Sequence, residues 1–341
     1  MGKVLTVGEI MMRLQPPSYQ RIMQANSFDI VFGGGEANVA VSLSEFGEDA
    51  VFFTKLPNNV LADKCIKELK GWGVDTSKIV RGGDRIGIYF CEKGCSQRAS
   101  NVTYDRANSS VSQMEISDFD VNEVLDGVSW LHWTGITPAL SDKATDFLRH
   151  ILRAAKMKGI TVSCDLNYRK KLWSKEKANK VMSELVTYVD VLISNEEDSK
   201  DVFSIEADNT DITSGKISKD GYVSIGKKLM EKFPNLKNVA FTLRESISAS
   251  QNGWSAILMD KDNVYASKKY MIQIVDRVGG GDSFGAGLIY GLKNGYSGQD
   301  TIEFAVAASC LKQTIEGDFN IVSVDEVKKL AGGDGSGRVS R

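Results

Sequence analysis

The sequence has no marked excess of charge of either sign and no long hydrophobic run. Lys and Arg total 42 and Asp and Glu total 44, which gives a formal net charge of −2. No basic excess therefore favours nucleic acid or an anionic membrane as a partner. No segment approaches the ~20 consecutive apolar residues that cross a bilayer, and the first residues lack the apolar core of a signal peptide. We expect a cytoplasmic protein that binds neither nucleic acid nor membrane.

Cysteine, histidine and proline are scarce as well. The 341 residues include five Cys and two His, and the odd number of scattered cysteines favours free thiols in a reducing compartment. Cys91 and Cys95 stand in a C-E-K-G-C pair, but no second pair exists to complete a zinc site, so such a site is disfavoured. Five Pro against 32 Gly indicate tight turns and close approaches of the backbone to a ligand.

Segments in which hydrophobic residues have the period of strands alternate along the sequence with segments in which they have the period of helices. Short apolar strands are predicted at residues 3–8, 51–56, 129–135, 160–167, 190–195 and 238–243. Helices are predicted at residues 33–47, 60–73, 143–159, 175–186, 196–203, 221–233, 280–295 and 300–315. This alternation predicts a parallel sheet covered by helices on both faces. The length allows two or three domains, but one large α/β unit with an appendage also fits.

A few segments depart from this alternation. Residues 85–94 and 97–106 are predicted to form two strands, which would pack as a separate small sheet. A turn-rich loop containing Pro16 and Pro17 is expected after the first strand. The Gly- and Ser-rich residues 332–341 predict a flexible tail.

The segment D-R-V-G-G-G-D-S-F-G-A-G at residues 276–287 carries the clearest chemical signal. Gly279, Gly280 and Gly281 lack a Cβ, so phosphate oxygens can approach their amides where a helix begins. The charge of Asp282 would repel a passively bound phosphate, but it is useful if Asp282 takes a proton from an attacking hydroxyl. Alternatively, the glycines form a tight turn and Asp282 caps the helix. The residues alone leave both interpretations open.

Two common nucleotide-binding signatures are absent from the sequence. No G-x-x-x-x-G-K-[ST] segment occurs, and no G-x-G-x-x-G follows the first strand. The sequence therefore lacks the usual signals of a P-loop ATPase and of a Rossmann dehydrogenase.

Two motifs resemble those of the ribokinase-like (PfkB-type) carbohydrate kinases. G-G-G-E-A-N-V-A at residues 33–40 is similar to the family's sugar-binding motif, and D-R-V-G-G-G-D-S-F at residues 276–284 is similar to its C-terminal motif. Arg277 stands where Thr is commoner in the family, and Gly280 where Ala is commoner. The resemblance covers residues 1–331. It implies a three-layer α/β/α domain with a mostly parallel central sheet, and a β-sheet lid from about residues 10–32 and 85–107.

The resemblance also implies ATP-dependent phosphorylation of a sugar hydroxyl in the presence of Mg²⁺. Asp282 would be the general base, and the amides of Gly279, Gly280 and Gly281 would stabilise charge on the transferred phosphoryl group. By the same resemblance, Gly33, Gly34 and Asn38 would bind the sugar, and Ser194, Asn195, Thr242 and Arg244 would bind ATP.

Two of these nucleotide-side assignments have alternatives. S-N-E-E-D at residues 194–198 resembles a family motif near the magnesium and phosphates, but Asp198 is one methylene shorter than the usual Glu. Alternatively, its acidic residues are a solvated helix N-terminus. T-L-R-E-S at residues 242–246 falls where a loop after a strand meets the nucleotide in the family, and Arg244 is alternatively an ordinary surface arginine.

The substrate class is suggested by three further segments. I-G-I-Y-F (86–90), V-T-Y-D-R (102–106) and D-L-N-Y-R-K-K-L-W (165–173) resemble the 2-keto-3-deoxygluconate kinase branch. The resemblance places Tyr89, Tyr104, Arg106 and Arg169 at an acidic sugar, and more weakly Asp318. Arginine suits a carboxylate because its planar fork donates two hydrogen bonds. Alternatively, the tyrosines only pack on the lid and Arg169 caps a helix.

Other functions remain open at this stage. A fructokinase, or another kinase of a neutral sugar or nucleoside, would share the fold but not need two arginines in the sugar pocket. A non-catalytic ligand-binding relative is a further alternative, although the presence of Asp282 gives it no support. Exposed lid edges often pair with a second copy, so we expect a homo-oligomer formed through the lid. The residues leave a monovalent-cation requirement open.

Overall fold

The computed structural model describes residues 2–208 and 219–335, and its centre is a nine-stranded sheet. The strand order is β14-β13-β12-β11-β10-β9-β1-β4, and β15 pairs with β13. Strands β4 to β12 of this order run parallel, whereas β13, β14 and β15 add antiparallel pairs at one edge. The expected mostly parallel sheet is confirmed. Its strands are β1 (Lys3–Val7), β4 (Ala50–Phe53), β9 (Val128–Thr134), β10 (Thr161–Asp165), β11 (Val191–Ser194), β12 (Asn238–Ser246), β13 (Gln251–Met259), β14 (Val264–Ala266) and β15 (Tyr270–Gln273).

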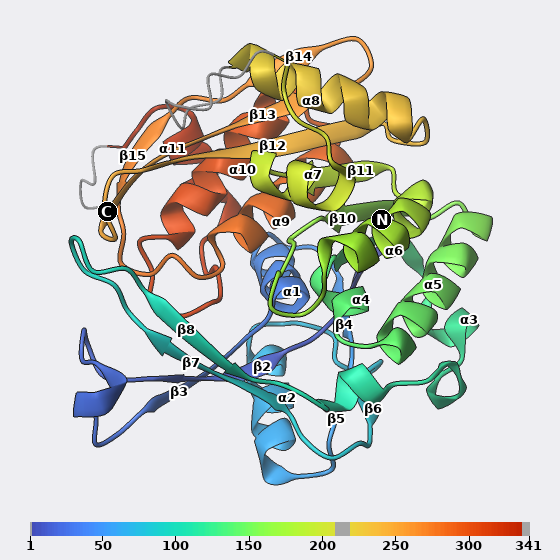
Figure 1. The fold of residues 1–341 in the computed structure, drawn as a ribbon, viewed down its shortest axis with the longest axis vertical. Coiled ribbons are helices and arrows are strands. Elements are labelled where there is room, and N and C mark those ends of the chain that lie inside the picture. The colour runs from blue at the N-terminus through green and yellow to red at the C-terminus, as the bar shows by residue number, and fades with distance from the viewer. Residues whose placement is uncertain (1, 209–218, 336–341) are drawn as a thin grey trace.

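Helices cover both faces of this sheet and give three layers (Figure 1). One hydrophobic core lies between the sheet and helices α3 to α8, and the other lies between the sheet and α1, α2, α9, α10 and α11. In β1, Leu5 and Val7 join the first core and Val4 the second, because successive strand side chains point to opposite faces. The helices are α1 (Gly35–Glu45), α2 (Val60–Gly71), α3 (Val121–Val124), α4 (Ile136–Ala139), α5 (Asp142–Met157), α6 (Lys175–Leu185), α7 (Glu196–Phe203), α8 (Lys219–Lys232), α9 (Gly280–Lys293), α10 (Gly298–Lys312) and α11 (Val324–Ala331).

A separate four-stranded sheet, with the order β3-β2-β7-β8, is called the small sheet below. Figure 1 shows it in blue and teal at the bottom of the view. The expected pair of strands within residues 85–106 is confirmed, and Tyr89 lies opposite Tyr104 in this antiparallel pair. The small sheet contains β2 (Met11–Gln15), β3 (Asp29–Gly33), β7 (Gly87–Glu92) and β8 (Asn101–Asp105), while β5 (Lys55–Leu56) and β6 (Val80–Arg81) form a two-stranded pair elsewhere.

Three sequence-based expectations need correction or completion. The loop expected directly after the first strand contains β2, which the pattern concealed because Arg13 and Gln15 are polar yet buried. Strand β12 continues past residue 243 to Ser246, because its pairing with β13 extends to Asn252. Helix α11 was not expected. Residues 336–341 of the expected tail lie outside the described residues.

Within the described ranges, no helix combines the length and the apolar character needed to cross a membrane.

Candidate active site

The carboxyl ends of β10, β11 and the adjoining strands open into a cleft of about 1070 Å³. This is the usual ligand position in open α/β sheets. The small sheet and the N-terminal end of α9 contribute the other walls of the cleft. Every site residue named from the sequence lines it: Gly33, Gly34, Asn38, Tyr89, Tyr104, Arg106, Arg169, Ser194, Asn195, Asp198, Thr242, Arg244, Gly279, Gly280, Gly281, Asp282 and Asp318.

Asp282 lies inside the first turn of α9 and is not its N-cap. The N-cap is Gly279, whose φ of +80° lies in the left-handed region that favours glycine. A Cβ at Gly279 would also collide with the main-chain carbonyl oxygen of Asp318. The interpretation of Asp282 as a simple helix cap is therefore wrong, and its carboxylate is available for another use.

Two of the three glycine amides expected to bind phosphate are free. Among the described residues, the N–H groups of Gly279, Gly281 and Asp282 have no hydrogen-bond acceptor, whereas Gly280 N–H donates to the Arg277 carbonyl over 3.3 Å. A Cβ at Gly281 would meet no atom within 4 Å, so the space beside it is open. Free amides at a helix N-terminus and the positive end of the helix dipole together favour an anion.

The side chain of Asn38 holds the Asp282 carboxylate. Its Nδ2 donates to Asp282 Oδ2 over 2.6 Å, and its Oδ1 accepts from Gly34 N–H over 3.2 Å. Gly33 provides space beside these groups, because a Cβ there would collide with the Asp318 carboxylate. The N-terminal glycine motif thus brings α1 against the first turn of α9.

Tyrosines of the small sheet form the wall nearest Asp318. Tyr89 is buried and its hydroxyl donates to Asp318 Oδ2. Tyr104 is 39% exposed, and its ring centroid lies 6.0 Å from that of Tyr89. Tyr89 therefore has a fixed polar partner, as a buried tyrosine hydroxyl requires.

The two arginines expected at the sugar differ in their surroundings. Arg106 is buried and donates from Nε and Nη2 to Glu9 Oε2, so Nη1 is the part of its fork that has no partner among residues 2–208 and 219–335. In the described ranges Arg169 has no carboxylate within 4 Å, and its Nη1 donates to the Tyr168 carbonyl over 3.1 Å. Both arginines line the cleft as expected, but Glu9 already neutralises Arg106.

Carboxylates gather beside Arg169 at the floor of the cleft. Burial raises the pKa of Asp165 to about 8, and the charges of Asp198 and Asp282 raise it as well. Burial also raises the pKa of Asp198 to about 6, and that of Asp282 to about 6, while Arg169 opposes each of these shifts. The Asn38 hydrogen bond further opposes the shift of Asp282. Asp282 can therefore take up a proton near neutral pH.

Two further arginines, Arg244 and Arg277, line the cleft. Arg244 lies in β12, not in a loop after the strand as expected, and Arg277 lies close enough for its pKa to be lowered by burial and by the Arg244 charge. In the described chain neither arginine has a carboxylate within 4 Å. Ser194 Oγ donates to the Asn195 carbonyl over 3.0 Å, and Thr242 lines the wall.

Asp198 lies in the first turn of α7. The N-cap residue Asn195 accepts from Asp198 N–H over 2.8 Å, and its Nδ2 donates to Asp198 Oδ2 over 3.0 Å. Asp198 is buried, so it does not belong to a solvated helix end as the alternative supposed. Across the residues described, no group of three or more His, Cys, Asp or Glu could hold a metal ion.

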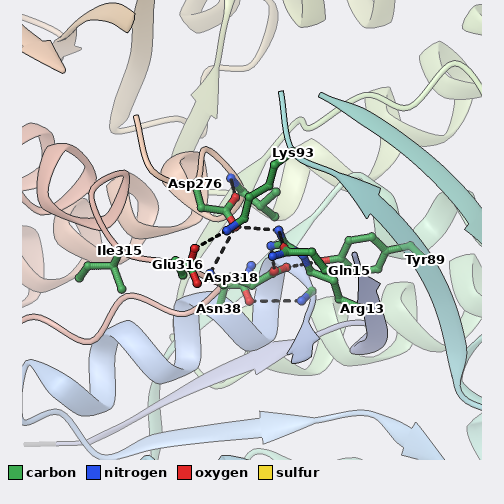
Figure 2. A network of polar contacts seen from close by, with 12 residues as sticks. Arg13, Gln15, Asn38, Tyr89, Lys93, Asp276, Ile315, Glu316 and Asp318 are labelled. Atoms are coloured by element: carbon green, nitrogen blue, oxygen red, sulfur yellow. Dashed lines mark hydrogen bonds and ion pairs between the residues drawn. The ribbon is translucent and has the colours of Figure 1, made fainter. Parts of the chain in front are cut away.

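Some residues of the site were missed from the sequence. Asp165 stands in the quoted D-L-N-Y-R segment, and its place at the end of a buried strand was the available signal. Arg277 was noted only as a departure from the family motif. Glu9 and Arg13 carry no sequence signal, since each becomes meaningful only beside a partner far along the chain. Figure 2 shows Arg13 between the carboxylates of Asp276 and Asp318.

Comparison with known proteins identifies the family. The model of the pfkB family of carbohydrate kinases matches residues 1–322. The chain belongs to the pfkB family of carbohydrate kinases. It is therefore a sugar kinase with the ribokinase-like fold, as the two glycine motifs implied.

Relatives within the pfkB family include proteins named for two related sugar acids. A 2-dehydro-3-deoxygluconokinase structure from Thermotoga maritima is 50% identical with a TM-score of 0.94, and the match covers 98% of this chain and 100% of that one. A 2-dehydro-3-deoxygalactonokinase from Haloferax volcanii is 32% identical over 98% of each chain. A 2-dehydro-3-deoxygluconokinase from Bacillus subtilis is 27% identical over 93% of this chain and 91% of its own.

Proposed function

We propose that this sugar kinase transfers the γ-phosphoryl group of ATP to the terminal hydroxyl of a sugar acid, 2-keto-3-deoxygluconate, to give its 6-phosphate. The observation that carries the proposal is the Asp282 carboxylate, held by Asn38 beside the free amides at the start of α9. A base and an anion-stabilising group together are what phosphoryl transfer to a hydroxyl requires.

In the proposed reaction, Asp282 accepts the proton of the terminal hydroxyl as its oxygen attacks the γ-phosphorus of ATP. The bond from phosphorus to the bridging oxygen breaks, and ADP leaves with those electrons. The free N–H groups of Gly281 and Asp282 donate to the oxygens of the transferred group, where negative charge is concentrated. Gly280 contributes no hydrogen bond to the phosphoryl group, because its N–H already donates to the Arg277 carbonyl.

Arg244 and Arg277 suit the phosphates of ATP because they line the cleft and have no carboxylate within 4 Å among the described residues. Ser194, Asn195 and Thr242 line the same end. Magnesium, when bound with ATP, would neutralise phosphate charge. The residues fit such an ion, because the mutual repulsion of Asp165 and Asp198 would be relieved by a cation. Mg²⁺ commonly uses one or two carboxylates with waters and phosphates, so a larger acidic cage is not needed.

The acidic character of the substrate is supported by Arg169, the cation of the sugar end that Glu9 does not neutralise. Arg106 Nη1, Tyr104 and Asp318 add polar groups around it. The names of the relatives point to the same class of sugar acid. These names differ in the configuration of one carbon, so the gluco and galacto forms are the two substrates to compare first.

A coupled ADP-release assay over sugar acids and neutral sugars tests the proposal. We expect the highest kcat/KM with a 2-keto-3-deoxy sugar acid, and much lower values with fructose and nucleosides. Preference for a neutral ketose would overturn the sugar-acid proposal and favour a fructokinase. No turnover of any substrate would favour a non-catalytic binding protein.

The Arg169→Ala variant sharpens this test. Loss of a charge-assisted hydrogen bond removes roughly 1.5–3 kcal/mol, so kcat/KM for the acid should fall at least ~10-fold. A neutral hexose should be affected much less, because it has no carboxylate. Equal losses for both substrates would show that Arg169 instead compensates the charges of Asp165, Asp198 and Asp282.

A further inference from the structure

Arg13 is a fully buried arginine that lies behind the wall of the cleft. It belongs to β2 of the small sheet and has an exposed fraction of 0%. Its Nη1 donates to Asp318 Oδ1 over 2.6 Å, and its Nη2 donates to Asp276 Oδ2 over 2.7 Å and to Gln15 Oε1. Figure 2 shows this single guanidinium joining the two carboxylates. Arg13 does not itself line the cleft.

The two carboxylates lead to different parts of the site. Asp318 lines the sugar end, and its second oxygen accepts from Tyr89. Asp276 lies in the loop between β15 and α9: its Oδ1 accepts from Val278 N–H over 3.1 Å, and its Oδ2 accepts from Gly317 N–H over 3.3 Å. Arg13 therefore contacts both a side chain that faces the sugar and the segment that carries the phosphate-facing amides.

The charges in this region compensate each other. Asp276 and Asp318 are nearly inaccessible, and so are Arg13 and Lys312. Lys312 donates to the main-chain carbonyls of Asp276, Ile315 and Gly317, so Arg13 is the cation that bonds the carboxylates directly. Removal of one partner of a buried ion pair leaves an uncompensated charge. Without Arg13, the two carboxylates would separate or become protonated.

We propose that Arg13 is a positioning residue that fixes Asp318 for the sugar and the segment 276–281 for the phosphoryl group at the same time. The inference rests on the proposed function and adds a residue of the small sheet to it. Arg13 acts through Asp318 and Asp276, and has no contact with substrate. The small sheet thus contributes to phosphoryl transfer as well as to the wall of the sugar pocket.

If Arg13 had only a structural role, its replacement would lower stability and leave the pH dependence of the remaining activity unchanged. If Arg13 positions Asp318, its replacement should change that pH dependence, because the Arg13 charge opposes the effect of burial, which raises the pKa of Asp318. The groups facing Asp318 are Arg13 of β2, Tyr89 of β7, Asp276 before α9, Asp282 of α9 and Lys312 of α10. Of these, Arg13 is the cation that bonds the Asp318 carboxylate.

The test measures kcat and KM against pH for Arg13→Met, with whichever sugar or sugar acid the wild-type protein phosphorylates best. An incorrect substrate proposal therefore leaves this test intact. We expect kcat/KM for the sugar to fall ~10²-fold, as for a misplacement of about 1 Å in an active site. Without Arg13 the pKa of Asp318 should rise by about one unit or more, since an opposite charge at this distance shifts a carboxyl pKa by ~1–3 units. We expect protonation of Asp318 to add to the titration of Asp282, so the acid limb of kcat/KM should lie at a higher pH than in the wild-type protein.

Lys93→Met is the matched control. Lys93 follows β7 of the small sheet and pairs with Glu316 over 2.6 Å, so it joins the same two regions without contacting Asp318 or Asp276. We expect its kcat and its pH profile to stay close to those of the wild-type protein. An equal loss of kcat/KM in Lys93→Met would overturn the proposal. It would show that the loss of any contact with the small sheet lowers activity, and that the contacts of Arg13 are not special.

Arg13→Lys decides the question if Arg13→Met yields too little folded protein. A lysine keeps the charge but lacks the planar fork that reaches both carboxylates. We expect an acid limb near that of the wild-type protein together with a kcat lowered ~10-fold or more, as misplacement predicts. Wild-type kcat in Arg13→Lys, or an unshifted acid limb in a folded Arg13→Met, would overturn the positioning role.

Discussion

The proposed sugar end and the proposed nucleotide end of the cleft differ in how much of their positive charge is paired with protein carboxylates. At the sugar end, Arg106 is paired with Glu9, and Arg13 with Asp318 and Asp276. At the nucleotide end, Arg244 and Arg277 face the cleft without a carboxylate within 4 Å among the described residues. Arg106 and Arg13 are thus paired before any ligand arrives, whereas Arg169, Arg244 and Arg277 are left for an anion to pair with.

Asp282→Asn should produce the largest loss. Removal of a general base typically lowers turnover ~10²–10⁴-fold, while an amide keeps the shape of the side chain. The melting temperature should change little, because Asp282 does not cap α9. The coupled ADP-release assay and a thermal melt measure the two effects. Activity within a few-fold of the wild-type value would show that another group takes the proton.

Gly281→Val should damage the nucleotide end alone. The Cβ position is open, and Gly281 has no positive φ, so the fold tolerates the side chain. The branched side chain would occupy the space before the free amides, and we expect kcat to fall and KM for ATP to rise, each by ~10-fold or more. KM for the sugar should stay within about two-fold of the wild-type value. A selective rise in KM for the sugar would contradict the proposed division of the cleft.

Arg244→Ala tests whether Arg244 binds the phosphates of ATP. A charge-assisted hydrogen bond contributes roughly 1.5–3 kcal/mol, so we expect KM for ATP to rise about ten-fold or more. The matched change at the sugar end is Glu9→Gln, which should leave KM for ATP unaltered and change KM for the sugar by freeing Arg106. An unchanged KM for ATP in Arg244→Ala would mean that Arg244 is an ordinary surface arginine.

The smallest effect concerns pH. Burial raises the pKa of Asp282 to about 6, so the base is protonated and inactive below that pH. We therefore expect kcat/KM to fall as the pH decreases through about 6, and to be constant above it until another group titrates. A pH profile in the wild-type protein measures this directly. An acid limb near pH 4 would show that ligands or a metal ion lower the pKa of Asp282 in the complex.

Some residues of the cleft could be predicted from the sequence and others could not. The glycine motifs could be recognised because each forms a short contiguous pattern of residue types in the sequence. The alternation of strands and helices predicted the main sheet for the same local reason. Glu9, Arg13 and the length of β12 could not be predicted, because each depends on a partner from another element. Polar side chains buried by such partners look like loop residues in a sequence.

The pairing of Arg13 with Asp318 joins residues separated by 305 positions. At roughly 5–20 residues per second of synthesis, about 15–60 s pass between the appearance of the two side chains. During that interval the small sheet can pair its strands, but its central cation has no partner to be buried against. The contacts of Arg13 with Asp318 and Asp276 can therefore form only late in synthesis. Chains released before residue 318 would have a paired small sheet whose Arg13 charge is not buried. Chaperones and proteases can distinguish such a form from the complete enzyme.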